Sequence, residues 1–216
     1  MNTITTPAPA RTDATIGTAH TVAAALPTSL PATFVRLGGG AIAALVAAFA
    51  VLIALPWPAG ATVSVAGEIG AIAFQVSTLV LLFVMWRTRA VGDSVGWRCL
   101  GVVVTVLVTI AVVTMIVQTV LPNEITLFAA NLSWYLAMAG MFLVGVGVVA
   151  RGQWRGLAGF LPLAAHSWPL VVLPVMLLTG DTEGQSWMVY VAYLAVTQAL
   201  IGLVLAIRPQ LTGARR

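Results

Sequence analysis

The segment that decides the fold is "CLGVVVTVLVTIAVVTMIVQTVL", residues 99–121, which contains 23 residues and no charged side chain. About 20 apolar residues allow an α-helix to cross the ~30 Å hydrocarbon core of a bilayer. An unpaired backbone N–H or C=O group is costly in that core, so an open strand is excluded and a helix is required. The segment therefore predicts a transmembrane helix.

The rest of the chain repeats this pattern. Hydrophobic residues make up 60% of the 216 residues and charged residues only 7%, whereas a soluble globular protein carries about 25% charged residues. The predicted fold class is an all-α polytopic membrane bundle of six transmembrane helices, within one domain at 35–208. The expected spans cover residues 37–55, 63–86, 99–121, 125–150, 156–179 and 187–207.

The two chain ends are expected to lie outside this bundle. Residues 1–34 are rich in Thr, Ala and Pro and show no amphipathic period, which predicts a disordered tail. Residues 209–216 form a short basic tail. An alternative is that 1–61 is a long signal peptide cleaved near "PAGA", although its apolar core of 19 residues exceeds the usual length of about 7–15.

Charged residues alternate between the two sides of the predicted bundle. Arginines precede the first span, flank the links at 87–98 and 151–155, and follow the last span. The remaining links carry no basic residue but contain Glu124, Asp181 and Glu183. Under the positive-inside rule, both termini face the cytoplasm. Arginine without lysine and abundant alanine, glycine and valine are typical of a high-GC bacterium, so the expected location is the bacterial inner membrane.

The composition also bears on partners and cofactors. The net charge of +4 and the pI near 10.2 resemble those of nucleic-acid-binding proteins, but the arginines are spread over several helix ends. We therefore expect no nucleic-acid partner and a lipid bilayer as the surroundings. The single Cys99 excludes a disulfide framework and a multi-cysteine metal site. Only His166 lies in a span, so haem ligation by two histidines is not expected. We expect neither cofactor nor metal.

One motif resembles a hydrolase nucleophile. "GDSVG" at 92–96 fits G-x-S-x-G, which needs a strand–turn–helix context and a nearby histidine. Here the motif lies in a short link, His20 lies in the tail, and His166 lies about 13 Å deeper in the bilayer. We interpret Ser94 as part of a turn, and we expect no enzyme activity.

Six polar side chains interrupt the apolar spans, and such residues are costly in lipid. At 1.5 Å per residue, Glu68, Gln118 and Asn131 fall in the outer third of the bilayer, and Gln75, His166 and Gln198 fall near its midplane. These positions predict a polar cleft that narrows from the outer face. Sequence defines their depth but not the direction in which each side chain points. Glu68 has a second interpretation, in which its carboxylate simply reaches the headgroup region.

His166 lies where prolines disturb the fifth span. Pro162, Pro169 and Pro174 each remove a backbone donor and loosen a carbonyl four residues earlier. Two interpretations of His166 stay open. A neutral imidazole can hydrogen-bond Gln75, Gln198 or a freed carbonyl and so join helices, or it can exchange protons in a wet cavity.

Small residues in the first span predict close helix contact. Gly40, Ala44 and Ala48 recur at four-residue spacing, which lets a neighbouring backbone approach. We expect this seam to pack inside the bundle, with a second protomer as the alternative.

The second half, with "WRGLAGFLPL" leading into "WPLVVLPVMLLTGD", resembles the small six-helix inner-membrane proteins of unknown function found in high-GC bacteria. This resemblance implies a non-enzymatic membrane protein and assigns no site residue. Two functions are open. One is a non-catalytic module that assembles with a membrane partner or a homo-oligomer, or responds to the envelope. The alternative is a small permease or proton-coupled carrier that uses the polar cleft, which requires the polar side chains to face one cavity.

Overall fold

A computed structural model of the chain describes residues 30–55, 64–179 and 185–214. Within these ranges the protein is all-α, as predicted, with seven α-helices and one short 3-10 helix. The helices are α1 Ala32–Ile53, α2 Val65–Arg87, α3 Val95–Val120, α4 Glu124–Arg151, α5 Gly156–His166, α6 Trp168–Thr179, α7 Gln185–Ile207 and η1 Pro209–Thr212. Five of them, α1 to α4 and α7, are long and apolar enough to cross a membrane.

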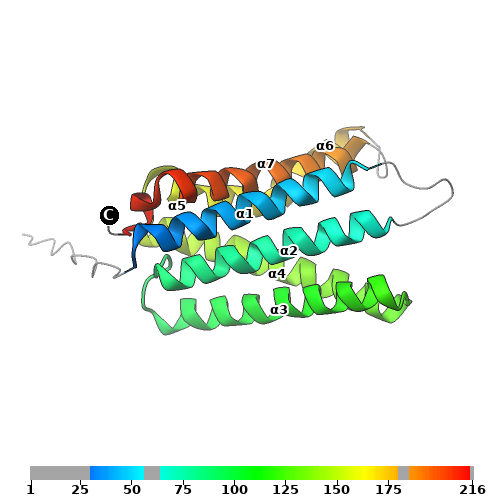
Figure 1. Cartoon of the computed structure of the whole chain (residues 1–216), viewed down its shortest axis with the longest axis horizontal. Coiled ribbons are helices and arrows are strands. Elements are labelled where there is room, and N and C mark those ends of the chain that lie inside the picture. Colours follow the sequence, from blue (N-terminus) through cyan, green and yellow to red (C-terminus); the bar gives the residue numbers. More distant parts are fainter. Residues whose placement is uncertain (1–29, 56–63, 180–184, 215–216) are drawn as a thin grey trace, which may run out of the picture.

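The helices form a ring. Each long helix packs on the next one in the chain, α5 packs on both α4 and α7, and α7 returns to α1 (Figure 1). The arginines of the described ranges lie at one end of this ring, which we call the arginine end; it holds the start of α1, the links between α2 and α3 and between α4 and α5, and η1. Within the part of the chain that the structure describes, the alternation of charge is therefore an alternation between two ends of one bundle.

The predicted fifth span, 156–179, is a broken helix. It consists of α5 and α6 with a break at Ser167, two residues before Pro169. At the break, the Ala164 carbonyl accepts hydrogen bonds from the Ser167 backbone N–H at 3.3 Å, from the Ser167 hydroxyl at 2.8 Å and from the Tyr193 hydroxyl of α7. These donors satisfy a carbonyl that the interrupted helix leaves without its usual partner.

The chain ends differ from the prediction. The first helix begins at Ala32, so residues 32–34 are helical, and the remainder of the predicted tail up to residue 29 lies outside the described residues. The predicted C-terminal tail begins as η1, which packs on α1, α5 and α7. Pro209 and Thr212 are buried there, and the Leu211 carbonyl accepts the Arg155 backbone N–H at 2.8 Å. Proline at the first helical position and glycine after the last explain this short helix.

The predicted seam of Gly40, Ala44 and Ala48 does not face the bundle. All three residues are exposed, and a Cβ placed on Gly40 would meet no atom within 4 Å. The close contact is made by Gly39, where a Cβ would lie 2.5 Å from the Gly202 carbonyl oxygen of α7. One residue corresponds to about 100° of rotation around a helix, so the neighbouring glycine faces a different surface.

These adjacent glycines provide a matched test of ring closure. We expect Gly39→Ala to lower the free energy of unfolding by about 1–3 kcal/mol, because the added methyl group overpacks the contact with α7. Gly40→Ala should be neutral or stabilising by up to about 1 kcal/mol, because alanine favours helix and meets no neighbour. Unfolding of both variants in one detergent measures this difference, and equal effects would contradict the contact.

Candidate functional site

A cavity of about 300 Å³ opens at the end of the ring opposite the arginines. Side chains from α1, α2, α3, α4 and α7 line it, so the cavity lies inside the ring. We call it the aromatic cavity, because five aromatic side chains surround a few polar groups. The aromatic residues are Phe49, Phe74, Trp134, Tyr135 and Tyr190, and the polar residues include Ser64, Glu68, Gln75 and Asn131.

Helix α2 supplies the two polar groups that define the depth of the cavity. Ser64 starts this helix, and its side chain accepts the Gly67 backbone N–H at 3.4 Å. Glu68 follows in the first turn and is half-buried. Gln75 lies seven residues further, which is about 10 Å deeper along the helix. Only 3% of Gln75 is exposed, and its Oε1 accepts no hydrogen bond from the described residues.

Aromatic contacts hold the walls together. The Phe74 ring contacts the Phe49 ring of α1 at 5.0 Å between centroids and the Trp134 ring of α4 at 5.9 Å, edge to face. Trp134 also hydrogen-bonds Tyr190 of α7. The two contacts of Trp134 bridge helices that are not neighbours in the ring, namely α4 with α2 and α4 with α7. Edge-to-face pairs add stability beyond their buried area.

Three of the six predicted polar residues meet in this cavity, namely Glu68, Gln75 and Asn131. Gln118 does not. Its Oε1 accepts the Asn123 backbone N–H at 3.1 Å and the Thr126 hydroxyl, so it secures the turn between α3 and α4. The position of Gln118 in the chain predicts its depth in the bilayer, but its side chain bonds the local connection between α3 and α4 instead of lining a cleft.

The two remaining midplane residues do not line the aromatic cavity. His166 is buried, and its Nδ1 lies 2.8 Å from the Pro162 carbonyl oxygen in the same helix. A carbonyl only accepts, so Nδ1 carries the hydrogen and Nε2 of the neutral ring is an acceptor. This bond lies within α5 and does not join helices. Gln198 is also buried, and its Nε2 donates to Ser77 Oγ of α2 at 3.5 Å.

Sequence reasoning missed the aromatic walls. A usable signal was present in α4, because Trp134 and Tyr135 follow Asn131 by three and four residues and so share its helix face. Phe49, Phe74 and Tyr190 carried no such signal, since aromatic residues in an apolar span are ordinary core residues.

The hydrolase-like motif belongs to the arginine end. Ser94 is the residue that precedes α3, and Asp93 pairs with Arg89 at 3.1 Å and with Arg98. Among the described residues, no group of three His, Cys, Asp or Glu side chains is arranged to hold a metal ion.

Comparisons of the chain with protein-family models, with curated proteins and with solved structures gave no match. The resemblance to small six-helix membrane proteins of high-GC bacteria therefore stays a prediction.

Proposed function

We propose that this chain is a non-catalytic, multi-pass membrane protein that binds a small organic ammonium ion in the aromatic cavity. The observation that carries the proposal is Gln75, a buried carboxamide whose Oε1 has no donor among the described residues and which lines a cavity that also holds the Glu68 carboxylate. In the proposed topology, α5 and α6 together make the fifth of six crossings.

The chemistry of the lining favours a cation. Glu68 supplies the only formal charge among the lining residues. The faces of Trp, Tyr and Phe rings attract ammonium groups, an effect used to bind choline and methyl-lysine. The Gln75 oxygen accepts a hydrogen bond, so it suits an ammonium group that carries N–H. A volume of about 300 Å³ limits the ligand to a small molecule.

Binding is tested with a primary amine, its trimethylammonium analogue and a neutral alcohol of the same shape, using Trp fluorescence and the thermal midpoint in detergent. We expect the amine and its analogue to bind and the alcohol to fail. Removing a charged partner costs roughly 1.5–3 kcal/mol, so Glu68→Gln should weaken amine binding on the order of 10- to 100-fold. Glu124→Gln is the matched control, because this exposed acid begins α4 at the same end outside the cavity lining.

Gln75 provides an internal check on the same assay. Gln75→Leu should weaken binding of the primary amine and leave the trimethylammonium analogue almost unchanged, because only the amine carries N–H groups. Tight binding of the alcohol, or equal effects of Glu68→Gln and Glu124→Gln, would overturn the proposal.

The carrier hypothesis has one observation in its favour, the break between α5 and α6. Against it, His166 and Gln198 do not line the cavity, and buried apolar side chains such as Leu81 and Met141 fill the bundle nearer the arginine end. We expect proteoliposomes to take up labelled amine no faster than protein-free liposomes. Saturable uptake that Glu68→Gln abolishes would instead establish a carrier.

The proposed orientation places the arginine end and both termini in the cytoplasm of a bacterial cell. In a Cys99→Ser background, Pro122→Cys marks the end with the aromatic cavity, and Gln210→Cys marks the arginine end; both positions are exposed. An impermeant maleimide should label Pro122→Cys in intact spheroplasts and Gln210→Cys only after permeabilisation. The reverse pattern would contradict the orientation.

A further inference from the structure

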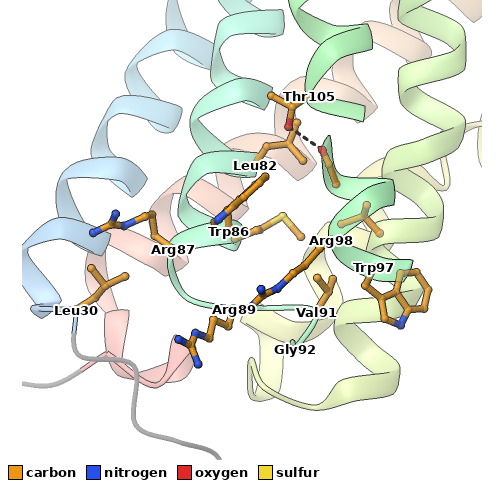
Figure 2. A pocket seen from close by; sticks show the side chains of 13 residues that line it. Leu30, Leu82, Trp86, Arg87, Arg89, Val91, Gly92, Trp97, Arg98 and Thr105 are labelled. Atoms are coloured by element: carbon orange, nitrogen blue, oxygen red, sulfur yellow. Dashed lines mark hydrogen bonds between the residues drawn. The ribbon is translucent and has the colours of Figure 1, made fainter. Parts of the chain in front are cut away.

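A second and larger cavity, of about 580 Å³, lies at the arginine end. Figure 2 shows it between the end of α2 and the start of α3, with Arg87, Arg89 and Arg98 arranged around it. We call it the arginine cavity. It shares no lining residue with the aromatic cavity, so the inference drawn from it does not depend on the proposed function.

The rim of the arginine cavity carries excess positive charge. Asp93 is paired with Arg89 and Arg98, and about half of each of these three side chains is exposed. Arg87 lies over the Phe34 ring, 6.0 Å from its centroid. The three arginines carry three positive charges and Asp93 carries one negative charge, so the net charge of this rim is +2. Two guanidinium groups thus already bind an oxyanion, the Asp93 carboxylate, and a phosphate group has the same preference for arginine.

The interior of the same cavity is apolar. Leu82 and Met85 of α2 and Val144 of α4 line it, and Thr105 uses its hydroxyl to bond the Gly101 carbonyl at 2.8 Å. A Cβ on Gly101 would meet no atom within 4 Å, so space is open beside α3. Thr105 lies seven residues beyond Arg98, which is about 10 Å along the helix. The cavity therefore joins a cationic rim to an apolar groove.

We propose that the arginine cavity binds an anionic phospholipid, with its phosphate on Arg98 and Arg89 and part of one acyl chain in the groove beside Leu82 and Gly101. A basic pocket between membrane helices is a known form of lipid-headgroup site. Exposed Trp86 lies beside this rim, where an amphipathic ring suits the headgroup level. A free phosphate would use the rim alone and leave the apolar groove without a role.

The test counts bound lipid by native mass spectrometry of the full chain in detergent, with phosphatidylglycerol and phosphatidylcholine of matched acyl chains in competition. Wild type should retain phosphatidylglycerol preferentially. Each arginine near a headgroup contributes roughly a fivefold preference, so Arg98→Gln should lose about that factor. Asp93→Asn removes the competing carboxylate and should strengthen phosphatidylglycerol binding, a change of opposite sign.

Arg208→Gln is the matched control, because it removes the same charge from the same end at an exposed residue outside the cavity lining. It should bind lipid like wild type. Equal losses in Arg98→Gln and Arg208→Gln would show general charge attraction and overturn the site. Soluble glycerol 3-phosphate should displace the lipid only weakly; displacement at concentrations equal to those of the lipid would show that free phosphate is the ligand and would overturn the lipid assignment.

Discussion

The contact between Gly39 and Gly202 is the constraint on which the rest of the structure depends. It brings the first helix against the last with backbone atoms almost touching, since a Cβ on Gly202 would lie 2.7 Å from the Ala43 nitrogen. In lipid, apolar side chains gain little by leaving their surroundings, so helices associate through close packing of small residues. Because α1 and α7 meet in this way, the helices close into a ring around the aromatic cavity instead of forming an open row of antiparallel helices.

A second close contact shapes the opposite side of the ring. Gly145 of α4 packs on α5 so tightly that a Cβ would lie 2.7 Å from the Leu163 Cα. Helix α5 is thereby held against α4 and α7, while the chain breaks at Ser167 and continues as α6, which packs on α7. The break leaves no unsatisfied carbonyl at Ala164, since Tyr193 of α7 reaches across to it. The helix is thus interrupted just before a proline, and a hydrogen bond from the neighbouring helix helps to satisfy the carbonyl at the break.

The two cavities differ in charge as the two ends of the bundle do. The aromatic cavity has one carboxylate, neutral amides and ring faces, a combination suited to a cation. The arginine cavity has three guanidinium groups around an apolar interior, a combination suited to an anionic amphiphile. A separation of this kind follows from the charge asymmetry of the chain, because arginines lie in alternate connections and the remaining connections carry no basic residue. The proposed ligands of the two sites therefore belong to opposite charge classes and to opposite ends of the protein.

Sequence alone determined where the helices lie along the chain, because helix length and apolar content are local properties. The prolines of the fifth span also indicated where its helix is disturbed. The charged residues indicated which connections lie at the same end of the bundle. Helix rotation could not be predicted, since a helix that is apolar on all sides has no hydrophobic face to orient it. For this reason the sequence did not indicate that Gly39 and not Gly40 makes the close contact. Nor did it indicate that only Glu68, Gln75 and Asn131 of the six polar residues share a cavity, or that His166 bonds within its own helix. Those arrangements depend on how each helix is rotated against its neighbours, and only the tertiary structure decides this rotation.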